Sequence, residues 1–292
     1  MPSEDRHETL RNESPFGFCL NTATIREQHL GIVDEIKLVA EIGYGGIEPW
    51  VRELDAYEQA GGRLSDLRQR IEDLGLHVPG AIAFFAWADA DADKRRGELE
   101  KARREMAKVA AIGGKTIAAP PFGDCAGRTL DELAECYRDL LAVGREMGVT
   151  PAVEVWGHAK VLSRLCDAAY IVTAGNAPDA CMVLDIYHLY KGGGGFDGIG
   201  LIAGSAIGVF HFNDYPAVPG RAEIADKDRV FPGDGVGPVR QVLTSLQAIG
   251  YRGMLSLELF NPEYYRRPAA EVAREGLAKM RAAVAAALHA QQ

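Results

Sequence analysis

Short apolar runs alternate with longer amphipathic stretches from Phe16 almost to the end of the chain. Runs of this length, rich in β-branched and aromatic residues, are typical of buried strands, whereas the stretches between them have the apolar spacing of helices. The predicted strands are residues 16–23, 44–50, 77–85, 115–121, 150–157, 180–188, 206–214 and 253–261. The predicted helices are residues 30–43, 64–75, 94–114, 130–148, 163–175, 197–204, 237–250 and 268–290. Most of these helical patterns end in glycine, which favours the left-handed conformation that closes a helix.

This alternation predicts an α/β protein with eight strand–helix repeats. Apolar strands separated by helices favour a parallel sheet covered by helices, and eight repeats match a closed (β/α)8 TIM barrel. A doubly wound sheet would carry a glycine-rich turn after its first strand, and the sequence CLNTAT contains none. Residues 1–14 are polar and aperiodic, so we expect a flexible N-terminal tail, followed by a single barrel domain over residues 15–292.

Composition narrows the classes of function. The chain has 292 residues, 47% of them hydrophobic, and a net charge of -9, which opposes binding to nucleic acid. It contains no apolar run long enough to cross a membrane and no signal peptide, so we expect a cytoplasmic protein without a membrane partner. The five cysteines lack close CxxC pairing, which favours reduced and mostly buried thiols: Cys19, Cys125, Cys136, Cys166 and Cys181.

Polar residues near the ends of the last four strands are the strongest chemical signal. Glu154, Asp185, His211 and Glu258 each lie between two apolar residues, in VEV, LDI, FHF and LEL. Successive side chains of a strand point to opposite faces, so these four point into the barrel. The carboxyl ends of barrel strands carry the active site in this fold, and we therefore expect the four side chains to meet there.

Three carboxylates buried together need compensation by positive charge. A structural ion-pair network would require buried Arg or Lys on the strands, but the strands contain almost none, and Lys115 begins its strand at the far end. Carboxylate oxygens with one imidazole suit a divalent cation instead. The sequence therefore predicts one bound divalent metal ion (Mn, Mg, Co or Zn).

The segments VEVWGH, VLDIYH, FHFNDYP, DKDRVFPGDG and LSLELFNPEYY resemble the sugar isomerase/epimerase family with xylose isomerase-like barrels. Within it, the last two segments are most similar to those of inosose (2-keto-myo-inositol) isomerases. The resemblance implies that Glu154, Asp185, His211 and Glu258 are the metal ligands. It also implies that Glu154 and Glu258 form the acid/base pair, and that His188 and Arg229 contact substrate.

The predicted activity is a metal-dependent isomerisation or epimerisation of a keto-sugar or keto-polyol. A divalent ion polarises the ketone, and a proton is transferred through a metal-stabilised cis-enediolate. Further candidates for substrate contact are His158, Trp156 and Glu48, the last with a hydrogen-bonding role behind the ligands as its alternative. Asn213 and Asp214 are candidates for orienting His211.

Three alternatives remain open from the sequence. A dehydratase could expel a hydroxyl from a keto-inositol or keto-sugar after the same enolisation. An apurinic-site endonuclease-type metal hydrolase would need more histidines in the early strands, and a non-catalytic barrel would bind no ion. We expect a small-molecule carbohydrate or polyol substrate and a homo-oligomer, either a dimer or a tetramer.

Overall fold

The computed structural model describes residues 14–288, so nearly all of the predicted N-terminal tail lies outside the described residues. The strands are β1 (Gly17–Asn21), β2 (Gly46–Glu48), β3 (Thr116–Ala119), β4 (Thr150–Glu154), β5 (Cys181–Asp185), β6 (Ile207–His211) and β7 (Met254–Leu257). The α-helices are α2 (Ile32–Ile42), α3 (Val51–Gln59), α4 (Leu64–Asp73), α5 (Ala92–Ala111), α6 (Leu130–Met147), α7 (Leu165–Ala174), α8 (Ile186–Gly192), α9 (Val239–Ala248), α10 (Pro262–Tyr265) and α11 (Ala269–Leu288). Short 3-10 helices are η1 (Thr22–Gln28), η2 (Asp197–Leu201), η3 (Gly204–Ala206) and η4 (Asp226–Asp228).

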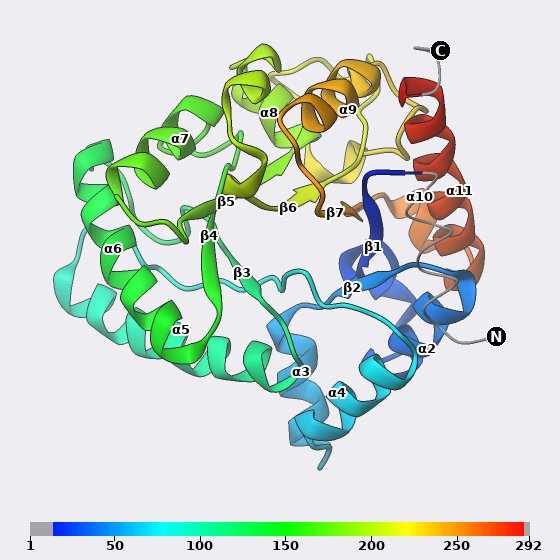
Figure 1. Cartoon of the computed structure of the whole chain (residues 1–292), viewed down its shortest axis with the longest axis horizontal. Coiled ribbons are helices and arrows are strands. Elements are labelled where there is room, and N and C mark those ends of the chain that lie inside the picture. Colours follow the sequence, from blue (N-terminus) through cyan, green and yellow to red (C-terminus); the bar gives the residue numbers. More distant parts are fainter. Residues whose placement is uncertain (1–13, 289–292) are drawn as a thin grey trace.

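The strands are all parallel and form one curled sheet in the order β2-β1-β7-β6-β5-β4-β3, surrounded by helices (Figure 1). The predicted third strand, residues 77–85, is an irregular extended segment that closes the gap between β2 and β3. On one side Ile47 N donates to His77 O, and on the other Ala118 N donates to Ala81 O, both over 2.9 Å. The predicted barrel is therefore confirmed, with one of its eight strands held by isolated bridges instead of a continuous ladder.

Helix ends follow the local sequence. The Thr129 hydroxyl accepts from Glu132 N, and the Glu132 carboxylate accepts from Thr129 N, which forms a capping box at the start of α6. Gly43 and Gly148 adopt the left-handed conformation that ends α2 and α6, as the glycine pattern predicts.

Two helices directly follow strands and were not predicted. The helix α3 begins three residues after β2, and α8 begins at Ile186, immediately after β5. The predicted strand over residues 180–188 was therefore too long, because the Asp185 carboxylate accepts from His188 N and caps a helix there.

The apolar core lies between the strands and the outer helices. The apolar neighbours of the four candidate residues are fully shielded members of this layer, for example Val153, Leu184, Phe210 and Leu257. A second cluster with Ala152, Cys181, Val183 and Val209 fills the barrel interior. Glu154, Asp185, His211 and Glu258 are each at most 4% exposed. The period-two pattern thus placed these side chains on the inner face.

The structure also bears on two expectations drawn from composition, one about membrane-spanning segments and one about the cysteines. Among residues 14–288, no helix has the length and apolarity that a membrane span requires. Cys19, Cys125, Cys136 and Cys181 are buried free thiols, whereas Cys166 is exposed.

Candidate active site

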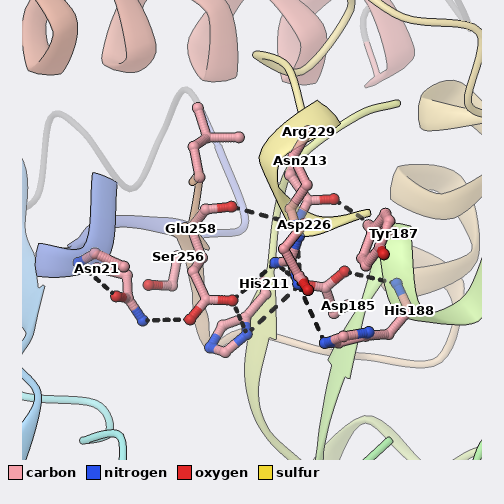
Figure 2. Close-up of polar contacts among 12 residues, drawn as sticks. Asn21, Asp185, Tyr187, His188, His211, Asn213, Asp226, Arg229, Ser256 and Glu258 are labelled. Carbon is pink, nitrogen blue, oxygen red and sulfur yellow. Dashed lines mark hydrogen bonds and ion pairs between the residues drawn. The ribbon is translucent and has the colours of Figure 1, made fainter. Parts of the chain in front are cut away.

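Strand register brings the chemical groups together at the carboxyl ends of β1, β2, β5, β6 and β7. Asn21 pairs with Glu48, Asp185 pairs with His211, and His211 in turn pairs with Ser256, two residues before Glu258. Because parallel neighbours at one level of a barrel point inward together, the groups converge on a common volume (Figure 2).

Asp185, His211 and Glu258 form the tightest part of this volume. One ligand atom from each lies within 4.8 Å of the other two. The His211 Nδ1 atom is 3.3 Å from Glu258 Oε2 and 3.7 Å from Asp185 Oδ2. Within residues 14–288, this is the group of three that could hold a metal ion.

His211 is held from behind by Glu48. Its Nε2 atom lies 3.1 Å from Glu48 Oε2, which also accepts from Ser256 Oγ (2.7 Å) and from Asn21 Nδ2 (2.9 Å). Burial lowers the pKa of His211, but the carboxylates of Glu258 and Glu48 outweigh it and raise that pKa well above its ordinary value. Glu48 thus lies within hydrogen-bonding distance of His211 on the side away from Asp185 and Glu258, which fits the hydrogen-bonding role that the sequence left open as its alternative.

The residues fit a divalent cation. His211 Nδ1 is buried and has no hydrogen-bond partner among the described residues, although two carboxylate oxygens lie close to it. A buried ring nitrogen facing carboxylates, with its other nitrogen fixed by a carboxylate, is the arrangement of a metal-binding imidazole. Two carboxylates and one imidazole are suitable ligands for zinc, manganese or cobalt.

Arg229 brings a positive charge next to these carboxylates, so the expectation that only a bound ion could neutralise them was wrong. The side chain is 1% exposed, and its Nη1 donates to Asp185 Oδ2 (2.9 Å) and Glu258 Oε2 (2.8 Å). It comes from the long loop after β6, next to η4, where a search restricted to strands could not find it. Although burial raises the pKa of Glu258, His211 and Arg229 outweigh it and hold that pKa well below its ordinary value.

Glu154 ends β4 and is 4% exposed, but it lies outside the group of three. Burial raises its pKa to about 8, opposed by His211 and reinforced by the charges of Glu258 and Asp185. Glu154 is therefore a carboxyl that readily holds a proton near neutral pH, and Glu258 is one that does not. Environments that separate two carboxyl pKa values in this way are characteristic of acid/base pairs. Its place as a fourth metal ligand stays a prediction.

His188 lies in the first turn of α8 rather than on a strand. Its Nε2 atom is 3.1 Å from Arg229 Nη2, and Arg229 Nη2 also donates to Asp226. Burial, helped by the charge of Arg229, lowers the pKa of His188 to about 3, so the imidazole is neutral at physiological pH. Arg229 and His188 are thus one connected polar wall of the site.

Aromatic rings form the rest of the wall. Trp156 and His158 stack with centroids 5.3 Å apart, and His158 lies 5.8 Å from His188. The series continues through Phe84, Trp50 and Phe260 with neighbouring centroids between 5.2 and 6.3 Å. Trp156 and His158 therefore belong to the rim of the barrel mouth, where the sequence placed them.

Some residues of the site were not predicted, or were given another role. Asn213 Nδ2 donates to Asp185 Oδ2 (2.9 Å), and Asp214 accepts from the backbone of Gly233, Gly235 and Gly237. The prediction that these two orient His211 was wrong, because Glu48 already occupies the free ring nitrogen. Ser256 could have been found by the inward period of LSLELF, since it precedes Glu258 by two residues.

Comparison with known proteins agrees with this fold. A family model described as the xylose isomerase-like TIM barrel matches residues 36–283. The chain belongs to the xylose isomerase-like TIM barrel family. Membership confirms both the fold and the family resemblance read from the sequence.

Two curated relatives and one solved structure are similar to this chain over most of its length. The inosose isomerase of Bacillus velezensis is 28% identical over 265 residues, which are 87% of this chain and 91% of the relative. The 3-dehydroshikimate dehydratase of Pseudomonas aeruginosa is 26% identical over 254 residues, which are 84% of this chain and 38% of the relative. A crystal structure of the IolI protein with a bound zinc atom has a TM-score of 0.86 and 24% identity, and covers 94% of this chain and 99% of that one. The matches confirm the prediction of a sugar isomerase/epimerase-type enzyme.

Proposed function

We propose that the protein is a divalent-metal-dependent isomerase or epimerase of a keto-sugar or keto-polyol. The observation that carries the proposal is the buried Nδ1 atom of His211, which lies between the carboxylates of Asp185 and Glu258 and has no hydrogen-bond partner in the described part of the chain. Asp185, His211 and Glu258 would hold the ion, with Glu154 as the fourth ligand. When bound, a divalent ion supplies Lewis-acid polarisation of a ketone oxygen.

The two glutamates are proposed to move the proton. One of them accepts a proton from the carbon next to the ketone, and the other donates one. The roles exchange in the reverse direction. Return of the proton to the same carbon from the opposite side gives epimerisation, and its return to the former carbonyl carbon moves the ketone.

Arg229 and His188 are proposed to orient the substrate hydroxyls. Arg229 is fixed by Asp226 and by stacking over Tyr187, with Cζ 4.5 Å from the ring centroid. The neutral His188 imidazole next to it offers hydrogen bonding without adding charge. Trp156 and His158 on the rim are suited to the C–H faces of a sugar or polyol ring and exclude water from the reacting carbons.

Proton exchange tests the proposal directly. Metal-loaded protein is incubated in D2O with a keto-inositol or a ketohexose, and deuterium next to the ketone is measured by NMR. We expect exchange in the unaltered protein and a loss of at least about 100-fold in Glu154→Gln and Glu258→Gln. The matched control is Glu53→Gln, because Glu53 binds Thr22 and the backbone of Trp50. Absence of exchange over a broad panel of ketones would contradict the proposal.

Loss of water is the second candidate outcome, and the match to the 3-dehydroshikimate dehydratase favours including it. Removal of the same proton would then be followed by departure of a hydroxyl on the next carbon. Product analysis by mass spectrometry separates the two, since dehydration lowers the product mass by one water and isomerisation does not change it.

A further inference from the structure

Arg229 contacts the same two carboxylate oxygens that face the ring nitrogen of His211. Its Nη1 atom donates to Asp185 Oδ2 (2.9 Å) and to Glu258 Oε2 (2.8 Å). These are the oxygens that lie 3.7 and 3.3 Å from His211 Nδ1 (Figure 2). A cation bound to these two oxygens and to the ring nitrogen would therefore share its ligands with a guanidinium.

The position of Arg229 is fixed independently of the two carboxylates. Its guanidinium lies over the rings of Tyr187 and Phe260, with Cζ 4.5 and 4.9 Å from the ring centroids. Its Nη2 atom donates to Asp226 in η4, and its backbone carbonyl accepts from Asn261 Nδ2 (3.0 Å). The side chain is 1% exposed, so it cannot turn to solvent without leaving both rings. Its positive charge should consequently stay beside the site when a cation binds.

The two carboxylates have other hydrogen bonds that hold them in place. Asp185 Oδ2 also accepts from Asn213 Nδ2 (2.9 Å), and Asp185 Oδ1 accepts from a backbone N–H in the first turn of α8 (2.9 Å). Glu258 Oε1 accepts from Asn21 Nδ2 (3.2 Å). These three donors are neutral, so they orient the carboxylates without repelling a cation. The particular contribution of Arg229 is therefore its charge.

A positive charge has two opposite effects at such a site. Before a cation binds, the charge offsets that of two buried carboxylates, which are costly to bury without a counter-ion. Once a cation binds, the same charge repels it at short range, and this repulsion is strong where water is excluded. Asp185 and Glu258 are 1% and 4% exposed, so water screens neither effect well.

We propose that Arg229 sets the affinity of the site for its divalent cation. It serves as the counter-ion of Asp185 and Glu258 before the cation binds, and it weakens binding of the cation afterwards. This inference rests on the proposed function, because it concerns the cation of the same site. The site then keeps its ligands in position without the cation, and holds the cation less tightly than the same ligands would without the guanidinium.

Removal of the charge tests the inference on metal binding itself. In Arg229→Gln we expect the Kd for zinc and for manganese to fall about 10- to 100-fold, because a repelling charge next to the cation is lost. Competition with a chromogenic chelator at constant pH and ionic strength measures the change. An equal or higher Kd in this variant overturns the inference, since the guanidinium would then organise the ligands instead of repelling the cation.

Lys227→Gln is the matched control. It removes the same charge from the same loop, but the Lys227 side chain is 67% exposed and pairs with Asp228. Exposed charges are screened by water and salt, so its Kd should stay within about 3-fold of that of the unaltered protein. A fall equal to that in Arg229→Gln would contradict a local effect of Arg229.

Thermal unfolding gives a second readout of the same variant. In the presence of a chelator, Arg229→Gln should have a lower Tm than the unaltered protein, because two buried carboxylates lose their counter-ion. Zinc should then raise the Tm of the variant by more than that of the unaltered protein, since tighter binding stabilises more at a given concentration. Equal increments in the two proteins contradict the inference.

Asp226→Asn tests the inference from the outer side of the guanidinium. The Asp226 side chain is 43% exposed and pairs with Arg229 Nη2, so its removal leaves the charge of Arg229 less compensated. We expect Kd to rise about 3- to 10-fold, opposite to the effect of Arg229→Gln. Asp228→Asn makes the same change in η4, where Asp228 pairs with Lys227, and should leave Kd nearly unchanged. An equal rise in Asp228→Asn would contradict a role of Arg229.

The deuterium exchange assay separates this inference from the proposed function. If no ketone exchanges deuterium while Kd falls in Arg229→Gln, the proposed function fails and the inference stands. If exchange occurs and Kd does not fall in Arg229→Gln, the inference fails and the proposed function stands. Failure of both the unaltered protein and Arg229→Gln to bind zinc or manganese overturns both.

Discussion

At the scale of single residues, one oxygen atom organises much of the site. Glu48 Oε2 accepts from Asn21 and Ser256 and faces His211 Nε2, so three strands are tied to one carboxylate. These contacts fix the ring of His211 with its Nδ1 atom toward Asp185 and Glu258. An imidazole with one fixed nitrogen loses little rotational freedom when the other nitrogen binds a cation.

Replacing Glu48 should therefore weaken metal binding without a direct contact to the ion. In Glu48→Gln we expect a 10- to 100-fold loss of affinity for zinc or manganese, the usual effect of removing such a supporting carboxylate. Competition with a chromogenic chelator measures the change, and circular dichroism checks the fold. Glu53→Gln makes the same chemical change on the neighbouring turn and should keep the affinity. Equal affinity in Glu48→Gln would show that His211 does not depend on this contact.

Residue-level prediction succeeded where strand periodicity applies. Inward positions in VEV, LDI, FHF and LEL follow from alternation alone, and all four side chains are buried on the inner face. Arg229 was predicted as a substrate contact only through resemblance, and its pairing with Asp185 and Glu258 could not be read from the sequence. Loop residues have no periodic spacing, so their direction depends on tertiary contacts.

Among the elements, the irregular segment of residues 77–85 packs closely against Glu48. A Cβ atom at Gly80 would lie 2.9 Å from Glu48 Oε1, 3.0 Å from Thr116 Oγ1 and 3.0 Å from Val209 Cγ2. The segment can thus approach β2 and β3 closely only because Gly80 lacks a side chain.

Gly80→Ala should consequently destabilise the protein by about 1–3 kcal/mol, the cost of overpacking, and weaken metal binding through displacement of Glu48. Gly97→Ala is the matched control, because Gly97 lies within α5 and a Cβ there meets nothing within 4 Å. That change should instead raise the free energy of unfolding by about 0.5–1 kcal/mol through helix propensity. Chemical denaturation of both variants provides the comparison. Equal stability of the two variants would contradict the packing argument.

The helix α2 carries a second element-level prediction, at Glu35. Burial, with the charge of Glu53, raises the pKa of Glu35 to about 8, above the value of about 4.3 expected in an unfolded chain. Between these values the folded protein holds a proton that the unfolded chain has released, so stability falls as the pH rises from about 4.5 to 8.

Glu35→Gln should remove this dependence. The free energy of unfolding of the variant should exceed that of the unaltered protein by a margin that grows with pH. Between pH 5 and pH 8 we expect this margin to increase by up to about 4 kcal/mol, from the difference between the two pKa values. Glu27→Gln removes an exposed carboxylate of η1 and leaves Glu35 in place, so its stability should change with pH as that of the unaltered protein does. Urea denaturation at several pH values makes the measurement. Parallel pH profiles of Glu35→Gln and the unaltered protein would refute the assignment.

The long elements were predictable and the short ones were not. Helices such as α5 and α6 carry several turns of apolar spacing, which outweighs local ambiguity. The helices α3 and α8 are short and follow their strands almost directly, so strand and helix patterns run together. Asp185 illustrates the difficulty, since one residue ends β5 and caps α8.

At the scale of the whole molecule, the candidate site joins segments that are distant in sequence. Asp185, His211 and Glu258 come from three consecutive strands, and Glu48 and Asn21 connect them to the first two strands. A ligand bound at this junction therefore stabilises contacts throughout the ring of strands. The order of strands could be predicted from the alternation of strands and helices in the sequence. Which side chains meet at the junction depends on the register between strands, and apolar patterning does not determine that register.

Metal binding should thus raise the thermal stability of the entire barrel. Any ligand that binds only the folded state stabilises it by mass action, by about 4 kcal/mol at a concentration 1,000 times its Kd. Titration with zinc or manganese should raise Tm progressively, and a chelator should reverse the rise. Asp185→Asn is the informative variant, because an asparagine still caps α8 but removes the charge that binds Arg229 and is proposed to bind the ion. Its Tm should respond weakly to metal, and a response equal to that of the unaltered protein would place the ion elsewhere.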